Sequence, residues 1–132
     1  MEMSIRLQEN KKVTAEFKGF TVATDQPQDA GGEGSAPSPF DLFLASLGTC
    51  AGFYIQSFCR TRSLPTEGIS ILQKMETDPQ KHLVTRVAIE VVLPKGFPEK
   101  YRAGLMSAAN LCTVKKHLQE PPRIEVSARM AD

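Results

Sequence analysis

The longest pattern in the chain is a run of residues without a charged side chain, over residues 42–59. A helix that carries no charge around its whole circumference is typically buried on all sides. Ser38 and Asp41 predict where this helix starts, because they form the pattern of a capping box. Pro65 disfavours continuation of the helix through the residue before it. We therefore expect a central helix over about residues 39–62, which one copy of so short a chain can hardly bury.

Alternating apolar and polar residues predict strands on both sides of this helix. Residues 1–24 alternate in three short segments separated by polar turns, which predicts an antiparallel meander. After the helix, alternation resumes over residues 68–75 and 83–93, and a last alternating strand is expected over residues 123–129. The segment 83–93 is rich in β-branched residues, which favour strands. Its inward-facing side chains are expected to be Leu83, Val87, Ile89 and Val91.

Two shorter helices are expected near the C-terminus. Apolar residues at helical spacing predict one over about residues 98–111, and a second over residues 113–119 ends before Pro121. The Pro- and Gly-rich residues 25–37 predict a loop without regular structure. Strands cluster in groups and do not alternate with helices, so we expect an α+β fold with a mostly antiparallel sheet around a long buried helix. The length fits a single domain over residues 1–132.

Composition narrows the classes of function. A net charge of +1 and scattered basic residues argue against a nucleic-acid partner. The uncharged run contains Gly, Ser, Thr and Gln, so we expect no membrane span. The first residues lack the apolar core of a signal peptide, which predicts a cytoplasmic protein. The cysteines and histidines do not have the spacing of zinc ligands, so we expect no structural zinc.

The three cysteines are the candidates for chemistry, because their odd number without an export signal disfavours structural disulfides. Cys50 lies in the middle of the expected helix between Gly48 and Gly52. Glycine costs about 1 kcal/mol relative to alanine inside a helix, so either a neighbouring helix or a substrate is expected to approach the backbone there. A free cysteine is also often a small buried hydrophobe. Cys59 points to the opposite face from Cys50 and is expected in the core.

Cys112 lies where one helix is expected to end and another to start. A thiol at a helix N-terminus gains from the partial positive charge there, so we expect a lowered pKa for Cys112. Lys115 and Lys116, one turn later, would add to this effect. The alternative is a buried cysteine at a helix junction.

Two segments together resemble the OsmC/Ohr family of organic hydroperoxide resistance and osmotically inducible proteins. The first is Pro37–Cys50 (PSPFDLFLASLGTC), and the second is Cys112–Leu118 (CTVKKHL). The resemblance covers essentially the whole chain, and the spacing of the two cysteines makes it fairly specific. It implies an OsmC-like fold and an intertwined homodimer, with central helices buried between two sheets and active sites at the subunit interface.

The same resemblance implies a thiol-dependent peroxidase of the oxidative stress response, with Cys50 and Cys112 as the catalytic residues. The Cys50 thiolate would attack an organic hydroperoxide and become a sulfenic acid, which Cys112 would convert to a disulfide. A dithiol reductant, a lipoyl group in the Ohr branch, would restore both thiols. The implied partners are a second copy of the chain, a hydroperoxide and this dithiol, without a metal or bound cofactor.

The chain departs from the family pattern at two positions that bear on this chemistry. Family peroxidases hold the thiolate with an arginine from the N-terminal region and a glutamate at the start of the central helix. Here Phe40 matches the glutamate, and no arginine occurs between Arg6 and Arg60. Nothing evident in the sequence therefore lowers the pKa of Cys50. The alternative function is a non-peroxidase OsmC-like protein that binds a small thiol, persulfide or electrophile in an apolar interfacial pocket.

Overall fold

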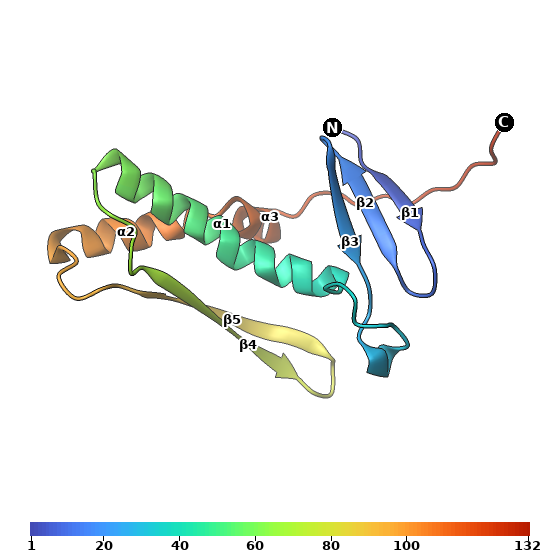
Figure 1. The fold of residues 1–132 in the computed structure, drawn as a ribbon, viewed down its shortest axis with the longest axis horizontal. Coiled ribbons are helices and arrows are strands. Elements are labelled where there is room, and N and C mark those ends of the chain that lie inside the picture. The colour runs from blue at the N-terminus through green and yellow to red at the C-terminus, as the bar shows by residue number, and fades with distance from the viewer. The chain divides into compact units, whose positions relative to one another are not determined.

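The computed structural model describes residues 1–132 and confirms the α+β fold class, with antiparallel strands and three α-helices (Figure 1). The chain divides into two compact units, Met1–Ser46 and Leu47–Asp132, each with its own sheet. The assignment of the chain to a single domain stays a prediction. The elements are β1 (Ser4–Leu7), β2 (Val13–Phe17), β3 (Phe20–Thr24), α1 (Pro39–Thr61), β4 (Ser70–Asp78), β5 (Leu83–Val92), α2 (Arg102–Ala109) and α3 (Thr113–Gln119), with 3₁₀ turns at Gln28–Ala30 and Glu99–Tyr101.

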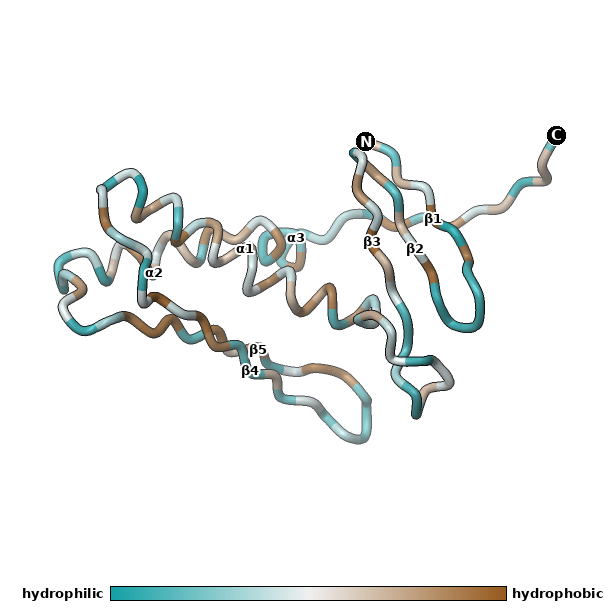
Figure 2. The backbone as a smooth tube through the Cα atoms, in the orientation of Figure 1, coloured by the Kyte–Doolittle hydropathy of each residue, from teal (hydrophilic) through white to brown (hydrophobic).

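The first unit contains the expected antiparallel meander, in which β2 pairs with β1 on one side and with β3 on the other. Residues with positive φ make the two turns: Asn10 between β1 and β2, and Lys18 with Gly19 between β2 and β3. Asparagine and glycine adopt this backbone region more readily than most residues. In Figure 2 the β1–β2 turn is hydrophilic. The unit buries no hydrophobic side chain, so its sheet lacks a core of its own.

A buried carboxylate organises the loop between β3 and α1. Asp25 has no accessible surface, and its carboxylate accepts a hydrogen bond of 2.7 Å from the backbone N–H of Gln26. It also accepts hydrogen bonds from the backbone N–H and the hydroxyl of Ser35, at 3.1 and 2.6 Å. The loop packs so closely that a Cβ atom at Gly32 would lie 2.0 Å from the Gln26 carbonyl oxygen. The loop expected from Pro and Gly content is thus ordered around one side chain.

α1 starts with the predicted capping box and ends one residue before its expected end. The Ser38 hydroxyl accepts a hydrogen bond of 3.1 Å from the Asp41 N–H. The Asp41 carboxylate in turn accepts one of 3.3 Å from the Ser38 N–H. Both side chains satisfy backbone donors that have no partner inside the helix. The buried residues of α1 form one stripe at a spacing of four: Leu47, Ala51, Ile55 and Cys59.

The expected burial of α1 on all sides is not met within one chain. Phe40 and Phe53 keep 51% and 59% of their surface exposed. One chain therefore covers only one face of an apolar helix. By length and composition alone α1 could also cross a membrane. The core helix of a soluble protein meets the same criteria, so this feature gives little support to a membrane location.

In the second unit, β4 and β5 form an antiparallel ribbon with a bulge that corrects the predicted side-chain pattern. Arg86 pairs with Glu76, but Val84 pairs with Thr77, so Thr85 is the extra residue on β5. A bulge reverses the inward and outward alternation beyond it. Leu83 is consequently 60% exposed, against the prediction, and Val84 is half-buried in its place. The other residues predicted to face inward are at least half-buried: Val87, Ile89 and Val91.

The helices after β5 match their predictions in position, with one difference in length. α3 has the predicted bounds, but the helix expected over residues 98–111 begins as a 3₁₀ turn and is α-helical only over Arg102–Ala109. Leu105 from α2 packs with Ile55 and Cys59 from α1 as the fully buried core of this unit. Side chains that pack around this cluster include Phe58, Leu64, Ile69, Ile71, Val91, Leu93, Phe97 and Ala109.

The strand predicted over residues 123–129 is absent, because the segment after α3 has no regular structure. Ile124 and Val126, whose alternation suggested a strand, are 83% and 94% exposed. A strand forms only where another strand satisfies its backbone N–H and C=O groups. No strand of the chain pairs with this segment, so its alternating pattern remains unpaired.

Candidate functional site

Cys50 lies in the middle of α1, where the two neighbouring glycines let β4 approach the helix. A Cβ atom at Gly48 would lie 2.5 Å from the side-chain oxygen of Gln73, and one at Gly52 would lie 3.4 Å from Ile71. The close approach predicted from the glycines is therefore real. Its cause is a strand that packs against α1, whereas a helix or a substrate was expected there.

Cys112 is the N-cap residue of α3, at the helix junction where it was predicted. Its buried sulfur accepts a hydrogen bond of 3.4 Å from the backbone N–H of Lys115. Its thiol donates a long hydrogen bond of 3.9 Å to the Leu47 carbonyl of α1. These two contacts hold Cys112 against the face of α1 that carries Cys50.

The structure brings the Cys50 and Cys112 side chains close enough for each to shift the pKa of the other. Burial by itself raises the pKa of Cys50, but four hydrogen bonds to its sulfur outweigh burial, so the pKa is lowered. The donors are the backbone N–H groups of Val114 and Thr113, the Thr113 hydroxyl and the Cys112 thiol. Hydrogen bonds to a charged form favour that form. The start of α3 therefore favours the Cys50 thiolate, an effect that the sequence did not predict.

The prediction of a lowered pKa for Cys112 is wrong. Burial raises the pKa of Cys112, and the neighbouring Cys50 raises it further because the Cys112 thiol hydrogen-bonds to it and because two adjacent thiolates repel each other. The hydrogen bonds from the backbone N–H groups of Lys115 and Val114 act in the opposite direction but do not compensate. The first amides of α3 thus stabilise the thiolate on α1 more than the thiol at their own N-cap.

Tyr54 and Thr113 complete the surroundings of Cys50 and were not predicted. Their hydroxyl oxygens lie 2.9 Å apart, in a hydrogen bond between α1 and α3. Tyr54 is one helical turn after Cys50, so the spacing of four residues was the available signal. Thr113 directly follows Cys112 in the sequence, but only the packing of α3 on α1 directs it toward Cys50.

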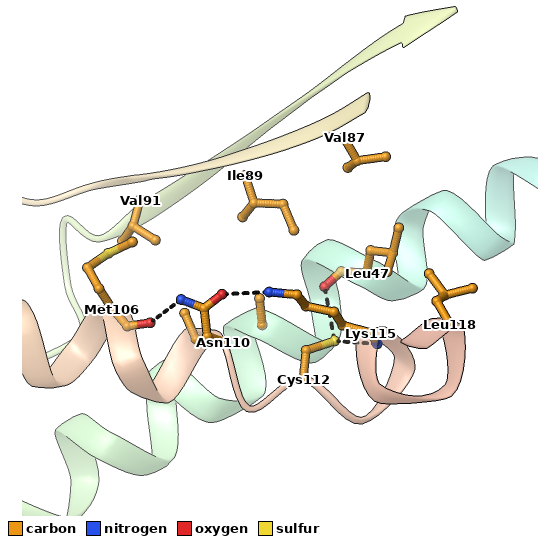
Figure 3. A pocket seen from close by; sticks show the side chains of 11 residues that line it. Leu47, Val87, Ile89, Val91, Met106, Asn110, Cys112, Lys115 and Leu118 are labelled. Atoms are coloured by element: carbon orange, nitrogen blue, oxygen red, sulfur yellow. Dashed lines mark hydrogen bonds between the residues drawn. The ribbon is translucent and has the colours of Figure 1, made fainter. Parts of the chain in front are cut away.

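An apolar cavity of about 310 Å³ opens beside Cys112, between α1, β5, α2 and α3 (Figure 3). Side chains of β5 point into it from one side and face the helices on the other. Cys112 lines this cavity, but Cys50 does not. The remaining lining residues are Leu47, Ala51, Val87, Ile89, Val91, Met106, Ala109, Asn110, Lys115 and Leu118.

The polar groups of this cavity form a short chain along its helical side. The Lys115 ammonium donates a hydrogen bond of 2.9 Å to the Asn110 side-chain oxygen. The Asn110 amide donates one of 3.2 Å to the Met106 carbonyl. Lys115 carries the single charge among the lining residues, so the cavity is apolar with one cationic edge.

The other residues considered from the sequence make contacts of their own. Cys59 is fully buried in the core, as predicted, and burial raises the pKa of its thiol. Arg6 forms an ion pair with Glu16 across the first sheet, at 3.3 Å. Glu33, in the loop before α1, forms an ion pair with Lys12. No group of three or more His, Cys, Asp or Glu side chains is arranged to hold a metal ion.

Comparisons with known proteins agree with this fold. The family model described as OsmC-like protein matches residues 32–127. No curated protein sequence matches the chain. One similar solved structure, described as an osmotic stress induced and detoxification response protein from Psychrobacter arcticus, has a TM-score of 0.74 and 23% identity and covers 86% of this chain and 85% of its own.

Two further solved structures carry names that refer to organic hydroperoxide resistance. The protein from Legionella pneumophila has a TM-score of 0.55 and 18% identity, with 90% of each chain covered. The protein from Vibrio cholerae, with captopril bound in one of its active sites, has a TM-score of 0.56 and 17% identity. It covers 92% of this chain and 86% of its own. At these identities the similarity establishes the fold.

Proposed function

Because the chain belongs to the OsmC-like protein family, we propose that it is a thiol-dependent peroxidase that reduces organic hydroperoxides with Cys50 and Cys112. One observation carries the proposal: Cys112 and the start of α3 lie beside Cys50, and hydrogen bonding from them lowers the pKa of its thiol. The thiolate is the nucleophilic form of cysteine. These donors therefore take the part that an arginine and a glutamate play in family peroxidases.

The proposed reaction has three steps. The Cys50 thiolate attacks the terminal oxygen of the hydroperoxide, the O–O bond breaks, and the alkoxide takes a proton to leave as the alcohol. Cys50 is then a sulfenic acid. The Cys112 sulfur attacks it, a disulfide forms, and the hydroxyl leaves as water with the Cys112 proton. Two thiol groups of a reductant then restore both cysteines and are themselves oxidised to a disulfide.

A homodimer is the second part of the proposal. Only six hydrophobic side chains of the 132-residue chain are buried, which is a small core for this length. Phe53 on α1 is largely exposed, and the apolar residues after α3 have no strand partner. A second copy of the chain would cover such surfaces. A reducing compartment such as the cytoplasm would keep the three cysteines in the free state of this structure.

Peroxide consumption with a dithiol reductant tests the peroxidase. We expect the unaltered protein to consume cumene hydroperoxide in the presence of dihydrolipoamide, and the Cys50→Ser variant to lose this activity. Cys59→Ser is the matched control, because Cys59 lies in the core and away from Cys50. If the unaltered protein consumes the peroxide no faster than Cys50→Ser, the peroxidase proposal fails.

A second candidate function is binding of a small thiol, persulfide or electrophile at the same site. The apolar cavity beside Cys112 favours it, as does the captopril, itself a thiol compound, in the Vibrio cholerae protein. No charged side chain is among the groups that lower the pKa of Cys50. This candidate predicts saturable binding of a small thiol or electrophile without peroxide turnover, which calorimetry and the peroxide assay together distinguish.

A further inference from the structure

The two thiols of the pair differ in which space they reach. Cys112 lines the apolar cavity between β5 and the three helices, and Cys50 does not. From α1, Leu47 and Ala51 line the cavity, whereas Cys50, which lies between them in the sequence, does not. A molecule in this cavity therefore contacts Cys112, which Figure 3 shows among the lining residues, and not Cys50.

We propose that a thiolate reductant enters this cavity and attacks the Cys112 sulfur of the oxidised protein, with Cys50 as the leaving thiolate. This inference rests on the proposed function, because it takes the Cys50–Cys112 disulfide as its starting point. In thiol–disulfide exchange the thiolate must reach the attacked sulfur from the side opposite the bond that breaks. Cys112 lines the cavity and Cys50 does not, so an attack from the cavity is directed at Cys112.

The pKa values of the two cysteines also favour attack at Cys112, as does the position of Cys112 in the cavity wall. A disulfide is cleaved faster when the leaving thiol has the lower pKa. Burial raises the pKa of both thiols, but at Cys50 the hydrogen bonds from Val114, Cys112 and Thr113 together outweigh burial and lower the pKa. Expulsion of Cys50 is therefore favoured over expulsion of Cys112.

The bonds and electrons of the proposed step balance. The reductant thiolate forms a bond to the Cys112 sulfur, the Cys112–Cys50 bond breaks, and Cys50 leaves as a thiolate. A second reductant thiolate then attacks the reductant sulfur of this mixed disulfide and releases Cys112, which takes a proton from solvent. Two reductant thiols are oxidised to one disulfide, and the protein disulfide is reduced by two electrons.

The cavity wall also indicates which reductants would enter. Hydrophobic side chains from β5 and the helices form most of its surface, and Lys115 contributes the single charge. An apolar thiol can bury its carbon atoms there, and the Lys115 ammonium attracts the anionic sulfur. Benzyl mercaptan is a suitable probe, because it is small, apolar and a monothiol.

Mapping of the mixed disulfide tests which sulfur is attacked. The full chain is oxidised with diamide, so the starting disulfide does not depend on peroxidase activity. Benzyl mercaptan is then added for a short time, excess iodoacetamide is added afterwards to alkylate the released thiolate, and peptides are mapped by mass. We expect the benzyl thiol on Cys112 and the acetamide on Cys50. The reverse assignment, equal labelling of both, or failure of diamide to link the two cysteines would overturn the inference.

A pair of variants on β5 tests the route of entry. Val87→Phe places a ring in the cavity, whereas Val92→Phe makes the same change outside the set of lining residues. We expect Val87→Phe to slow reduction of the diamide-formed disulfide by benzyl mercaptan about fivefold or more, because exchange depends on access. The disulfide of Val92→Phe should be reduced at the same rate as that of the unaltered protein. Equal rates for the two variants would exclude the cavity as the route, whether or not the protein consumes hydroperoxides.

Discussion

The hydroxyls of Tyr54 and Thr113 lie 2.9 Å apart and join α1 to the first residue of α3. The Thr113 hydroxyl also donates to the Cys50 sulfur. A hydroxyl has one proton to donate, so Tyr54 is the donor in this contact whenever Thr113 donates to the Cys50 sulfur. Tyr54, Thr113 and Cys50 then form a chain of hydrogen bonds that ends on the Cys50 thiolate. Hydrogen bonds in such a chain strengthen one another.

Removal of the Thr113 hydroxyl should make Cys50 less reactive. Thr113→Val keeps the shape of the side chain but removes one donor to the thiolate, so the pKa of Cys50 should rise. A hydrogen bond of about 1 kcal/mol corresponds to a roughly fivefold slower alkylation by iodoacetamide at pH 7. The pH dependence of the alkylation rate measures this change. Thr61→Val, at the end of α1 where Thr61 bonds only the Ser57 carbonyl, is the control and should alkylate at the original rate.

Loss of the Asp25 carboxylate should destabilise the loop between β3 and α1. Hydrogen bonds from the Ser35 hydroxyl, which outweigh burial, and from the backbone lower the pKa of Asp25 from 3.8 to about 2. The carboxylate therefore stabilises the folded state above pH 3.8, and this stabilisation is lost as the pH falls from about 3.8 to about 2.

Asp25→Asn should show this contribution directly. We expect the variant to be less stable than the unaltered protein at pH 7, with a smaller loss of stability between pH 4 and pH 2. Denaturant unfolding across this pH range measures both quantities. Asp29→Asn, in the same loop, is the control. A variant that loses as much stability in acid as the unaltered protein would show that Asp25 is not the responsible group.

A charge on the exposed face of α1 should dissociate the proposed homodimer. Phe53 is 59% exposed in one chain, and burial of a glutamate in an apolar interface is strongly unfavourable. We expect Phe53→Glu to sediment as a monomer at concentrations where the unaltered protein is a dimer. Leu83→Glu makes a comparable change at a side chain that is 60% exposed at the start of β5. Dissociation by both variants, or by neither, would count against α1 as the interface.

Two glycine-to-alanine changes should affect stability differently. A Cβ atom at Gly104 in α2 would lie 2.9 Å from the Phe58 ring, which is also covered by the Arg62 guanidinium at 3.7 Å. Overpacking costs about 1–3 kcal/mol, which exceeds the helix preference of alanine, about 1 kcal/mol. Gly104→Ala should therefore lower the free energy of unfolding.

Gly48→Ala is the matched change in α1, and we expect it to alter the free energy of unfolding by less than Gly104→Ala. Its Cβ atom would meet the end of the Gln73 side chain, which can rotate away. Denaturant unfolding of both variants checks the difference. A larger loss for Gly48→Ala would mean that the Gln73 side chain is fixed by its other contacts.

The sequence was sufficient where local chemistry decides the structure. Ser38 and Asp41 form the reciprocal cap that their spacing predicted, and α3 has its predicted bounds. Leu83 was placed on the wrong face because the bulge at Thr85 depends on pairing with β4, which single-strand alternation does not reveal. Residues 123–129 alternate as a strand would, but a strand also requires a partner to pair with, and none is present.

The candidate site shows which part of the prediction depended on packing. The resemblance to the OsmC/Ohr family pointed to Cys50 and Cys112, which lie close together in the structure, and their catalytic role stays a prediction. The effect of the helix N-terminus was assigned to Cys112 because that residue precedes α3 in the sequence. In three dimensions the amides of Thr113 and Val114 also reach Cys50 on another helix. Which sulfur receives these hydrogen bonds depends on tertiary packing.

The position of Tyr54 also gives the protein an internal optical reporter. The chain contains no tryptophan and only two tyrosines. Its intrinsic tyrosine fluorescence therefore comes from two phenol rings. The hydroxyl of one, Tyr54, is hydrogen-bonded to Thr113, the residue after Cys112. Disulfides quench nearby tyrosines, so unlabelled protein should change its emission when Cys50 and Cys112 are oxidised, and the change can be followed in real time.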